Sequence, residues 1–316
     1  MLRVLRLSIL IALPVLLIEA QPGRINGPVT GYVFDNSARA LRPILGLPGA
    51  SLVGDPLALG FDVATAFVAP RQDAAIVMAA DRSLHVFRID AGAVAERNLD
   101  SLPAGAERVV FSPSGTSAAI YAGGSLTVLK GLPDAPVISG GMDLRSGTVL
   151  DSLAISDDGK AVLISANGAV RLFGSFTDLG KLLDSSGGVL MAFASGGHDA
   201  AIADPSGAGI VLFHDLTGAG DSRVLATPDD AVSAFSDLAF TADGKRLLVA
   251  SSRSQSILAF DLTAGGRSAI DCQCTPQSLA RMGTFFRLNN LGNEPLWLLD
   301  ARASEPRVWF VPALAQ

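Results

Sequence analysis

Residues 238–261, LAFTADGKRLLVASSRSQSILAFD, contain the pattern that decides the fold. A short apolar segment, Leu238–Phe240, leads into a polar turn with Asp243–Gly244 at its end. A second apolar run covers Arg246–Ser251, and a third covers Ile257–Asp261. A tight hairpin needs positive φ, which glycine adopts without a Cβ clash, while aspartate caps the turn backbone. The stretch therefore predicts three consecutive antiparallel strands.

The same three-part pattern recurs with a period of roughly 40–45 residues, which is typical of β-propeller blades. The residues that anchor the first strands are Phe67, Phe111, Ile155, Phe193 and Phe240, at spacings of 44, 44, 38 and 47 residues. The second runs are Ala74–Ala80, Ser117–Ala122, Ala161–Ala166, Ala200–Ala203 and Arg246–Ser251. The third segments are Leu84–Asp90, Leu126–Leu129, Val170–Phe173, Ile210–Asp215 and Ile257–Asp261. Helical periodicity is confined to Leu179–Leu183, which amounts to one turn at most.

The number of third segments sets the expected number of blades. Two further copies occur at Gly31–Asp35 and Pro295–Asp300, which makes seven, and Leu279–Met282 is a degenerate first strand. We therefore expect an all-β chain with a single seven-bladed β-propeller, with six blades as the alternative. A pair of β-sandwiches is the other all-β architecture, but it gives no reason for this period.

Propellers commonly close by joining strands from the two ends of the chain. The C-terminal segment Arg307–Val311 is an apolar run of strand length. We expect it to add to Tyr32–Asp35 and Leu41–Leu45, so that N- and C-terminal strands close the ring.

The first 20 residues read as a secretory signal peptide. Arg3 and Arg6 supply the positive start, and Leu7–Ile18 is apolar apart from one serine. An uncleaved membrane anchor is the alternative, but it needs about 20 apolar residues. We therefore expect a signal peptide over residues 1–20 and a propeller domain over residues 21–316, exported to the periplasm or secreted, with no transmembrane segment after signal removal.

Composition excludes two classes of protein. The chain has 24 Lys+Arg against 30 Asp+Glu, a net charge of −6, so a basic nucleic-acid-binding surface is not its main feature. Charged residues make up 17% and hydrophobic residues 49%, which is too apolar for an intrinsically disordered chain.

Motifs for catalysis are missing from the sequence. The three histidines, His85, His198 and His214, are isolated, with no His-x-His or His-Glu-x-x-His pair to arrange a metal. No Gly-x-Ser-x-Gly nucleophile elbow occurs. We therefore assign no catalytic residue, no metal ligand and no cofactor.

Cys272 and Cys274 are the only cysteines, and one residue separates them. An oxidising compartment favours a disulfide. In a regular strand their Cα atoms would be roughly 6.5–7 Å apart, at the far edge of disulfide geometry, and a local turn before Pro276 would shorten this distance. Three readings stay open: a small-ring disulfide, two free thiols, or a metal or redox role.

The region 281–307 is denser in arginine, asparagine and tryptophan than the rest of the chain. We interpret its two tryptophans, Trp297 and Trp309, as core or ring-closing residues. The remaining polar residues are the candidates for a partner-binding rim at the channel. The residues predicted for this rim are Arg281, Arg287, Asn289 and Asn293.

Over most of residues 60–270 the turn-and-strand units resemble bacterial propeller repeats of the WD40-like and YVTN lactonase-like types. The Trp-Asp dipeptide and the Gly-His element of true WD40 blades are absent. The resemblance implies an architecture and does not transfer a mechanism. The sequence favours an exported, non-catalytic scaffold that binds a protein or an envelope component. The alternatives are a lactonase-like propeller that hydrolyses a small molecule and a structural module of a larger surface assembly.

Overall fold

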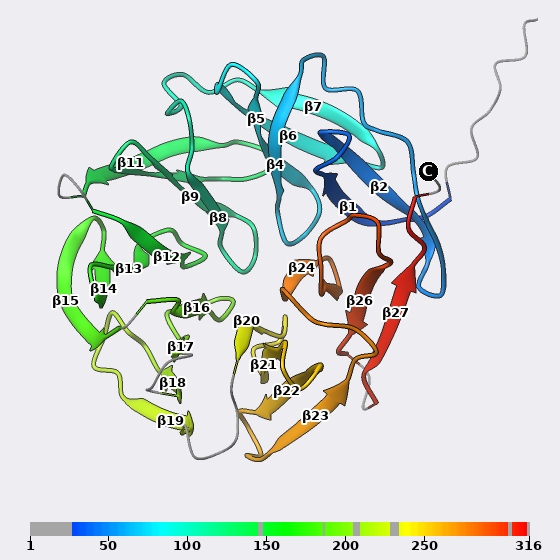
Figure 1. The fold of residues 1–316 in the computed structure, drawn as a ribbon. Helices are drawn as coiled ribbons and strands as arrows, with labels where there is room; N and C mark the ends of the chain where they lie inside the picture. Colours follow the sequence, from blue (N-terminus) through cyan, green and yellow to red (C-terminus); the bar gives the residue numbers. More distant parts are fainter. Residues whose placement is uncertain are drawn as a thin grey trace, which may run out of the picture.

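The chain forms a ring of seven sheets. The computed structural model describes residues 27–144, 148–185, 187–204, 209–227, 234–302 and 305–314. These residues contain 27 strands and no helix, and the strands form seven antiparallel sheets arranged as blades around a central axis (Figure 1). The predicted all-β fold and the predicted seven blades are confirmed. The predicted signal peptide, residues 1–20, lies outside the described residues.

Each sheet is a meander of strands that are consecutive in the chain. Blade 1 has β1 (Val29–Asp35), β2 (Ala40–Leu47) and β3 (Ala50–Val53). Blade 2 has β4 (Val63–Val68), β5 (Ala74–Ala79), β6 (Leu84–Asp90) and β7 (Ala93–Arg97). Blade 3 has β8 (Arg108–Phe111), β9 (Ser117–Ala122), β10 (Ser125–Lys130) and β11 (Val137–Asp143). Blade 4 has β12 (Leu150–Ile155), β13 (Ala161–Ala166), β14 (Ala169–Gly174) and β15 (Thr177–Asp184).

The last three blades repeat this arrangement. Blade 5 has β16 (Leu190–Phe193), β17 (Ala200–Asp204), β18 (Gly209–Phe213) and β19 (Ser222–Ala226). Blade 6 has β20 (Phe235–Phe240), β21 (Arg246–Ser251), β22 (Ser256–Asp261) and β23 (Arg267–Asp271). Blade 7 has β24 (Ala280–Met282), β25 (Phe285–Arg287), β26 (Leu296–Asp300) and β27 (Arg307–Val311). The first strand of each blade lies nearest the central axis, as Figure 1 shows.

The repeated turns have the predicted conformation. Gly115, Gly159 and Gly244 have φ of 73°, 64° and 67°, and each donates its N–H to the carbonyl three residues earlier. In two of the turns the preceding aspartate caps the backbone. Asp243 accepts hydrogen bonds from the Thr241 hydroxyl at 2.6 Å and the Lys245 N–H at 3.2 Å. The sequence motif is therefore the hairpin turn between the first two strands of a blade.

The hydrophobic core lies between the blades. Seven clusters of buried side chains each join two consecutive blades, and one of them joins blade 7 to blade 1. All six residues of strand β9 are buried, which explains the continuous apolar run from Ala118 to Ala122. Ala118 belongs to the cluster shared with blade 2, and Ala119 belongs to the cluster shared with blade 4.

The outermost strands of blades 1 to 6 were not predicted from the sequence. Leu179–Leu183, interpreted as one helical turn at most, lies within β15, which pairs with β14. Most of its side chains are exposed or half-buried, because no further strand covers it. An outermost strand therefore lacks the apolar pattern by which the inner strands were recognised.

Blade 1 differs from the other blades in its number of strands and in the direction of its innermost strand, β1. Gly31 lies beside Met282, the last residue of β24, and beside Gln72 in the turn after β4. Asp35, at the other end of β1, bridges Leu291 in the loop after β25. Strand β1 therefore runs opposite to β4 and β24. The three strands of blade 1 correspond to the second, third and fourth strands of the other blades, so the prediction of Gly31–Asp35 as a third strand was wrong.

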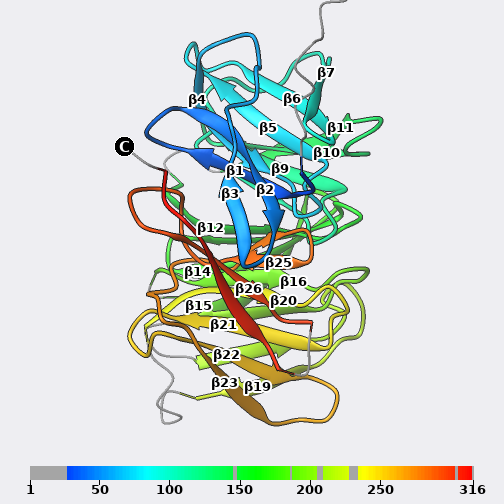
Figure 2. The same cartoon turned by 90° about the vertical axis from the view of Figure 1, so that its right-hand side faces the viewer.

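The two ends of the chain close the ring, but the predicted pairing between them is wrong. Strand β27 pairs with β26 of its own blade and does not join the sheet of β1 and β2. Blades 1 and 7 are held together by side chains, including Val33 and Ile44 against Leu298 and Val311. Trp309 on β27 also lies against Gly49 in the β2–β3 turn. In Figure 2 the red strand β27 passes beside β3.

The turn glycines provide a test of the repeat. We expect Gly244→Ala to lower the free energy of unfolding by about 1 kcal/mol, because alanine is strained at positive φ. No atom lies within 4 Å of the added Cβ, so the effect isolates backbone strain. The measurement is the midpoint of urea unfolding. Gly292→Ala is the matched control, since its Cβ also meets nothing and its φ is not positive. Equal midpoints for the two variants would contradict the assignment.

Candidate functional site

The centre of the ring contains a continuous cavity. One part, of about 530 Å³, is lined by β8, β12, β16, β20 and β24. A second part, of about 360 Å³, lies toward blade 1 and is lined by β1, β4, β8 and β24. The two parts share their lining at Val68, Val109, Phe111, Ala280 and Arg281. We refer to both parts together as the channel cavity.

Three arginines line the channel cavity. Arg108 begins β8, Arg281 is the middle residue of β24, and Arg287 ends β25. Arg281 reaches across to blade 3, where it donates to the carbonyl of Pro113 at 3.2 Å, and it also donates to the carbonyl of Gly283 at 3.1 Å. Among the described residues, none of the three arginines forms an ion pair. Burial lowers the pKa of Arg281 and Arg287, and nearby carboxylates oppose this effect.

Asp237 is the one acidic residue among the described residues that line the channel cavity. Burial raises the pKa of its carboxyl group, although two N–H groups and the charge of Arg287 favour the ionised form. The N–H of Leu279, just before β24, donates to Asp237 at 2.7 Å, and the N–H of Leu238 donates at 2.8 Å. Asp237 therefore holds the chain between blades 6 and 7 against the channel strand β20.

A second aspartate joins three blades at the opposite end of the channel. Asp157, in the turn after β12, accepts hydrogen bonds from the Ser114 N–H at 2.6 Å, the Ser195 hydroxyl at 2.9 Å and the Gly196 N–H at 2.8 Å. Burial opposes ionisation of Asp157, but these bonds outweigh burial and lower its pKa. The charge of Asp157 also favours the cationic form of Arg281.

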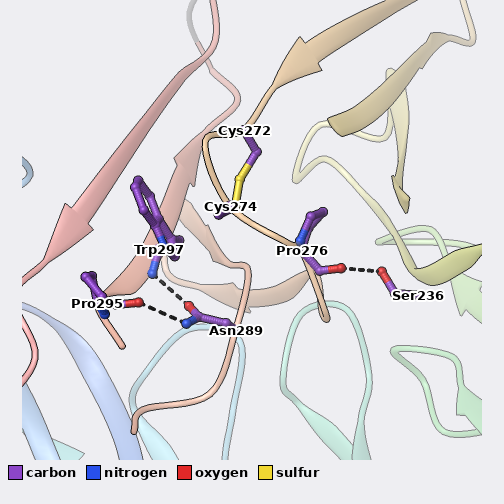
Figure 3. Close-up of a disulfide and its surroundings, with 7 residues drawn as sticks. All are labelled: Ser236, Cys272, Cys274, Pro276, Asn289, Pro295 and Trp297. Atoms are coloured by element: carbon purple, nitrogen blue, oxygen red, sulfur yellow. Dashed lines mark hydrogen bonds between the residues drawn. A yellow bond between two sulfur atoms is a disulfide. The ribbon is translucent and has the colours of Figure 1, made fainter. Parts of the chain in front are cut away.

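The segment between blades 6 and 7 contains the two cysteines, which form a disulfide (Figure 3). Cys272 is buried and Cys274 is partly buried, and the Cα atoms are 5.0 Å apart. The Ser236 hydroxyl donates to the carbonyl of Pro276 at 2.7 Å, which holds this segment to β20. On the chain-entropy model, a loop this short contributes only roughly 1.6 kcal/mol, about a third of what a 100-residue loop contributes.

The predicted rim residues divide into two groups. Arg281 and Arg287 line the same part of the channel cavity. Asn289 is buried, donates to the carbonyl of Pro295 at 2.9 Å and accepts from the Trp297 N–H at 2.8 Å, so it fixes the loop before β26. Asn293 is exposed in that loop and does not line the cavity.

Other candidates from the sequence lie away from the cavity. The three histidines each contact one carboxylate: His85 contacts Glu96, His198 contacts Asp158, and His214 contacts Asp199. In the part of the chain that the structure describes, no three metal-binding side chains come together. Trp297 packs in the cluster between blades 6 and 7, and Trp309 lies at the closing interface.

Sequence reasoning missed Arg108, Asp237 and Gln72. Arg108 and Asp237 each directly precede an apolar first-strand motif. The position of a charged residue next to a first-strand motif could therefore have indicated a site residue, because the first strands line the channel. No sequence signal marked Gln72, which accepts the N–H of Tyr32 at 2.6 Å across two blades.

The pH dependence of protein stability tests whether the aspartates in the turn after β12 stabilise the fold through their charge. Burial opposes ionisation of Asp158, but bonds from the Lys160 N–H, the Ser156 hydroxyl and His198 lower its pKa to about 2. A carboxyl group with a lowered folded pKa stabilises the protein above its unfolded value of about 3.9, and this contribution is lost as pH falls toward 2.

We expect Asp158→Asn to reduce the free energy of unfolding by about 1 kcal/mol at pH 7, since the side chain is 40% exposed and solvent screens it. The difference from wild type should shrink toward zero between pH 4 and pH 2. Urea unfolding of both proteins across this range is the measurement. A difference that stays constant with pH would show that the charge of Asp158 is not what stabilises the turn.

No helix in the described part of the chain has the length and apolarity needed to cross a membrane.

Comparisons with known proteins place the fold. No protein-family model and no curated protein matches the chain. A protein of unknown function from Desulfotomaculum acetoxidans has a TM-score of 0.60 at 12% identity, over 90% of this chain and 100% of that chain. A candidate 6-phosphogluconolactonase from Bacteroides uniformis has a TM-score of 0.59 at 12% identity, over 90% and 95%. The WD40 domain of SCAP from fission yeast has a TM-score of 0.51 at 12% identity, over 77% and 60%. The chain is a seven-bladed β-propeller, similar in fold to lactonase-like and WD40 propellers.

Proposed function

We propose that this chain is a binding propeller that recognises an anionic group in its channel cavity. The observation that carries the proposal is the set of three arginines, Arg108, Arg281 and Arg287, none of which has an ion-pair partner among the described residues. The cavity is cationic in a chain whose net charge is −6. A low-dielectric channel lined by one sign of charge concentrates ligands of the opposite sign.

The rest of the lining suits a small organic anion or an acidic side chain of a partner. Phe34, Phe67 and Phe111 offer apolar surface, while Gln72 and the arginines offer polar groups. Guanidinium groups bind carboxylates and phosphates through paired hydrogen bonds. The volumes of the two parts, about 360 and 530 Å³, suit a ligand of metabolite size.

The partner and the compartment belong to the same proposal. The signal-like sequence at residues 1–20 supports export, and an exported propeller meets the proteins and other components of the cell envelope. An acidic group on such a component would enter the channel, with the surrounding turns as the wider contact surface.

A lactonase-like hydrolase is the alternative function. Solved propellers of similar fold include candidate 6-phosphogluconolactonases. Lactone hydrolysis needs a general base or a metal-bound water. Asp237, the one carboxyl group among the described lining residues, has a raised pKa and already accepts two backbone N–H groups. The site therefore supports binding better than hydrolysis.

Calorimetric titration with three probes tests the binding function. The probes are 6-phosphogluconate, gluconate and neutral glucose. We expect the affinity to fall in that order, with glucose not bound. Arg287→Ala should weaken binding of 6-phosphogluconate by 10-fold or more, because one charge-assisted hydrogen bond contributes about 1.5–3 kcal/mol. Arg223→Ala, which removes an exposed arginine on β19, is the matched control and should bind as wild type does.

Two further results separate the alternatives. Hydrolysis of 6-phosphogluconolactone above the uncatalysed rate, lost in Asp237→Asn, would favour the enzyme. Capture of an envelope component by wild type and Arg223→Ala, but not by Arg287→Ala, would favour the scaffold. Equal binding of the probes and of envelope components by all three proteins would refute a role for the channel arginines.

A further inference from the structure

The Cys272–Cys274 disulfide lies at the start of the only segment that connects blade 6 to blade 7. This segment runs from Cys272 to Leu279 and leads directly into β24, which carries Arg281. Figure 3 shows the disulfide between Trp297 on one side and the Pro276–Ser236 bond on the other. We name residues 272–279 the blade 6–7 connector.

We propose that this disulfide is a thiol-exchange site whose opening loosens the blade 6–7 connector and changes the channel cavity. The two sulfur atoms differ in access, since Cys272 is 4% exposed and Cys274 is partly exposed. An incoming thiol therefore reaches Cys274 first, and Cys272 is the buried leaving group.

The reaction is an ordinary thiol–disulfide exchange with a dithiol. A thiolate of the reagent attacks Sγ of Cys274, the bond to Cys272 breaks, and Cys272 leaves as a thiolate that takes a proton from water. The second thiol of the reagent then attacks the mixed disulfide and releases Cys274 as a thiol. The protein disulfide gains two electrons and two protons, and the reagent is oxidised to its own disulfide.

Opening the bond has a geometric consequence for the connector. The disulfide holds the two Cα atoms 5.0 Å apart, whereas two residues of extended chain span about 6.6 Å. Without the bond, the sulfur atoms must also separate to van der Waals distance. Cys272 is buried in the same hydrophobic cluster as Ile270, Leu279 and Phe286, and a close-packed cluster leaves little space for this separation without movement of the backbone.

Two hydrogen bonds transmit this movement to the channel strand β20. Pro276 accepts from the Ser236 hydroxyl at 2.7 Å, and the Leu279 N–H donates to Asp237 at 2.7 Å. If the connector shifts, Asp237 loses the N–H of Leu279, and its carboxyl group is free to turn toward Arg287, whose charge already favours its ionised form. An anion bound by Arg287 then has an internal competitor. Reduction should therefore weaken anion binding, a consequence that rests on the proposed function.

The first test follows the exchange itself in the native full chain. The chain is incubated in buffers of reduced and oxidised dithiothreitol, free thiols are trapped with iodoacetamide, and the intact mass is measured. Because the chain has two cysteines, the mass counts the open disulfide directly. We expect reduction without denaturant, and amide hydrogen exchange at Leu279 that becomes at least tenfold faster in the same titration. A disulfide that opens only on unfolding, or unchanged protection of Leu279, would overturn the proposal.

A variant provides the matched control. Cys272→Ser with Cys274→Ser should show the fast exchange at Leu279 with and without dithiothreitol, while wild type changes only when reduced. If the double variant does not fold, the wild-type titration decides alone. Tryptophan fluorescence, to which Trp297 of the same cluster contributes along with Trp309, should change in the same titration and gives a second signal.

The last measurement separates the switch from the proposed function. Affinity for 6-phosphogluconate should fall at least threefold on reduction of wild type and stay unaffected by dithiothreitol in the double variant. If no probe binds in either state but Leu279 responds to reduction, the switch stands and the proposed function fails. If the probe binds equally in both states, the coupling between the connector and the channel is refuted.

Discussion

Packing between the faces of consecutive blades is the constraint on which the rest of this structure depends. A single blade has no core of its own, because its second strand is buried on both faces, as β9 shows. Ala118 and Ala119, adjacent in β9, serve two different interfaces. Every blade therefore needs two neighbours, and the ring must close to avoid two exposed apolar faces. Val33 and Ile44 against Leu298 and Val311 meet this need, together with the backbone bridge between Asp35 and Leu291.

The same constraint shapes the channel. Seven sheets around one axis bring their first strands together, and the charged residues of the site come from the first strands β8, β20 and β24 and from the end of β25. Asp157 and Asp237 both accept N–H groups from a neighbouring blade, so their charges are used to join blades. Arg281 donates only to backbone carbonyls. Arg287 is near enough to Asp237 for their charges to interact, but no ion pair joins them among the described residues. An acidic chain thus acquires a cationic centre because its channel acids are occupied and its channel arginines are not.

Much of the fold could be predicted from the sequence because the repeat consists of buried strands, which must be apolar. The first three strands of blades 2 to 6 were each recognised, since burial imposes apolar runs on them. Strand β11, exposed along most of its length, shows why the fourth strands were missed. Gly31–Asp35 was misplaced because its Phe-Asp ending matches third strands such as Ile257–Asp261, and only the three-dimensional direction of β1 distinguishes them.

The candidate site was predictable only in part. Local composition found Arg281 and Arg287, but the same reasoning included Asn289 and Asn293, which lie beyond β25 and away from the cavity. Composition along the chain does not report which side of a strand faces the axis. Arg108 comes from blade 3 and Asp237 from blade 6, so their place beside the arginines of blade 7 depends on how the blades are arranged around the axis, which no local pattern encodes.

The missing strand of blade 1 also explains where one part of the candidate site lies. Blade 1 lacks a strand that corresponds to the first strand of the other blades, and this leaves the part of the channel cavity beside β1. An open strand edge would invite pairing with another chain. Here Gln72 accepts the N–H of Tyr32 at 2.6 Å, and Leu291 bridges Asp35, so side chain and loop satisfy the edge in place of a strand. These substitutes occupy less space than a strand, and the remaining volume is where Arg287 meets the channel. The missing strand therefore leaves the cavity part of about 360 Å³ beside β1, next to the part of about 530 Å³ that the complete blades enclose.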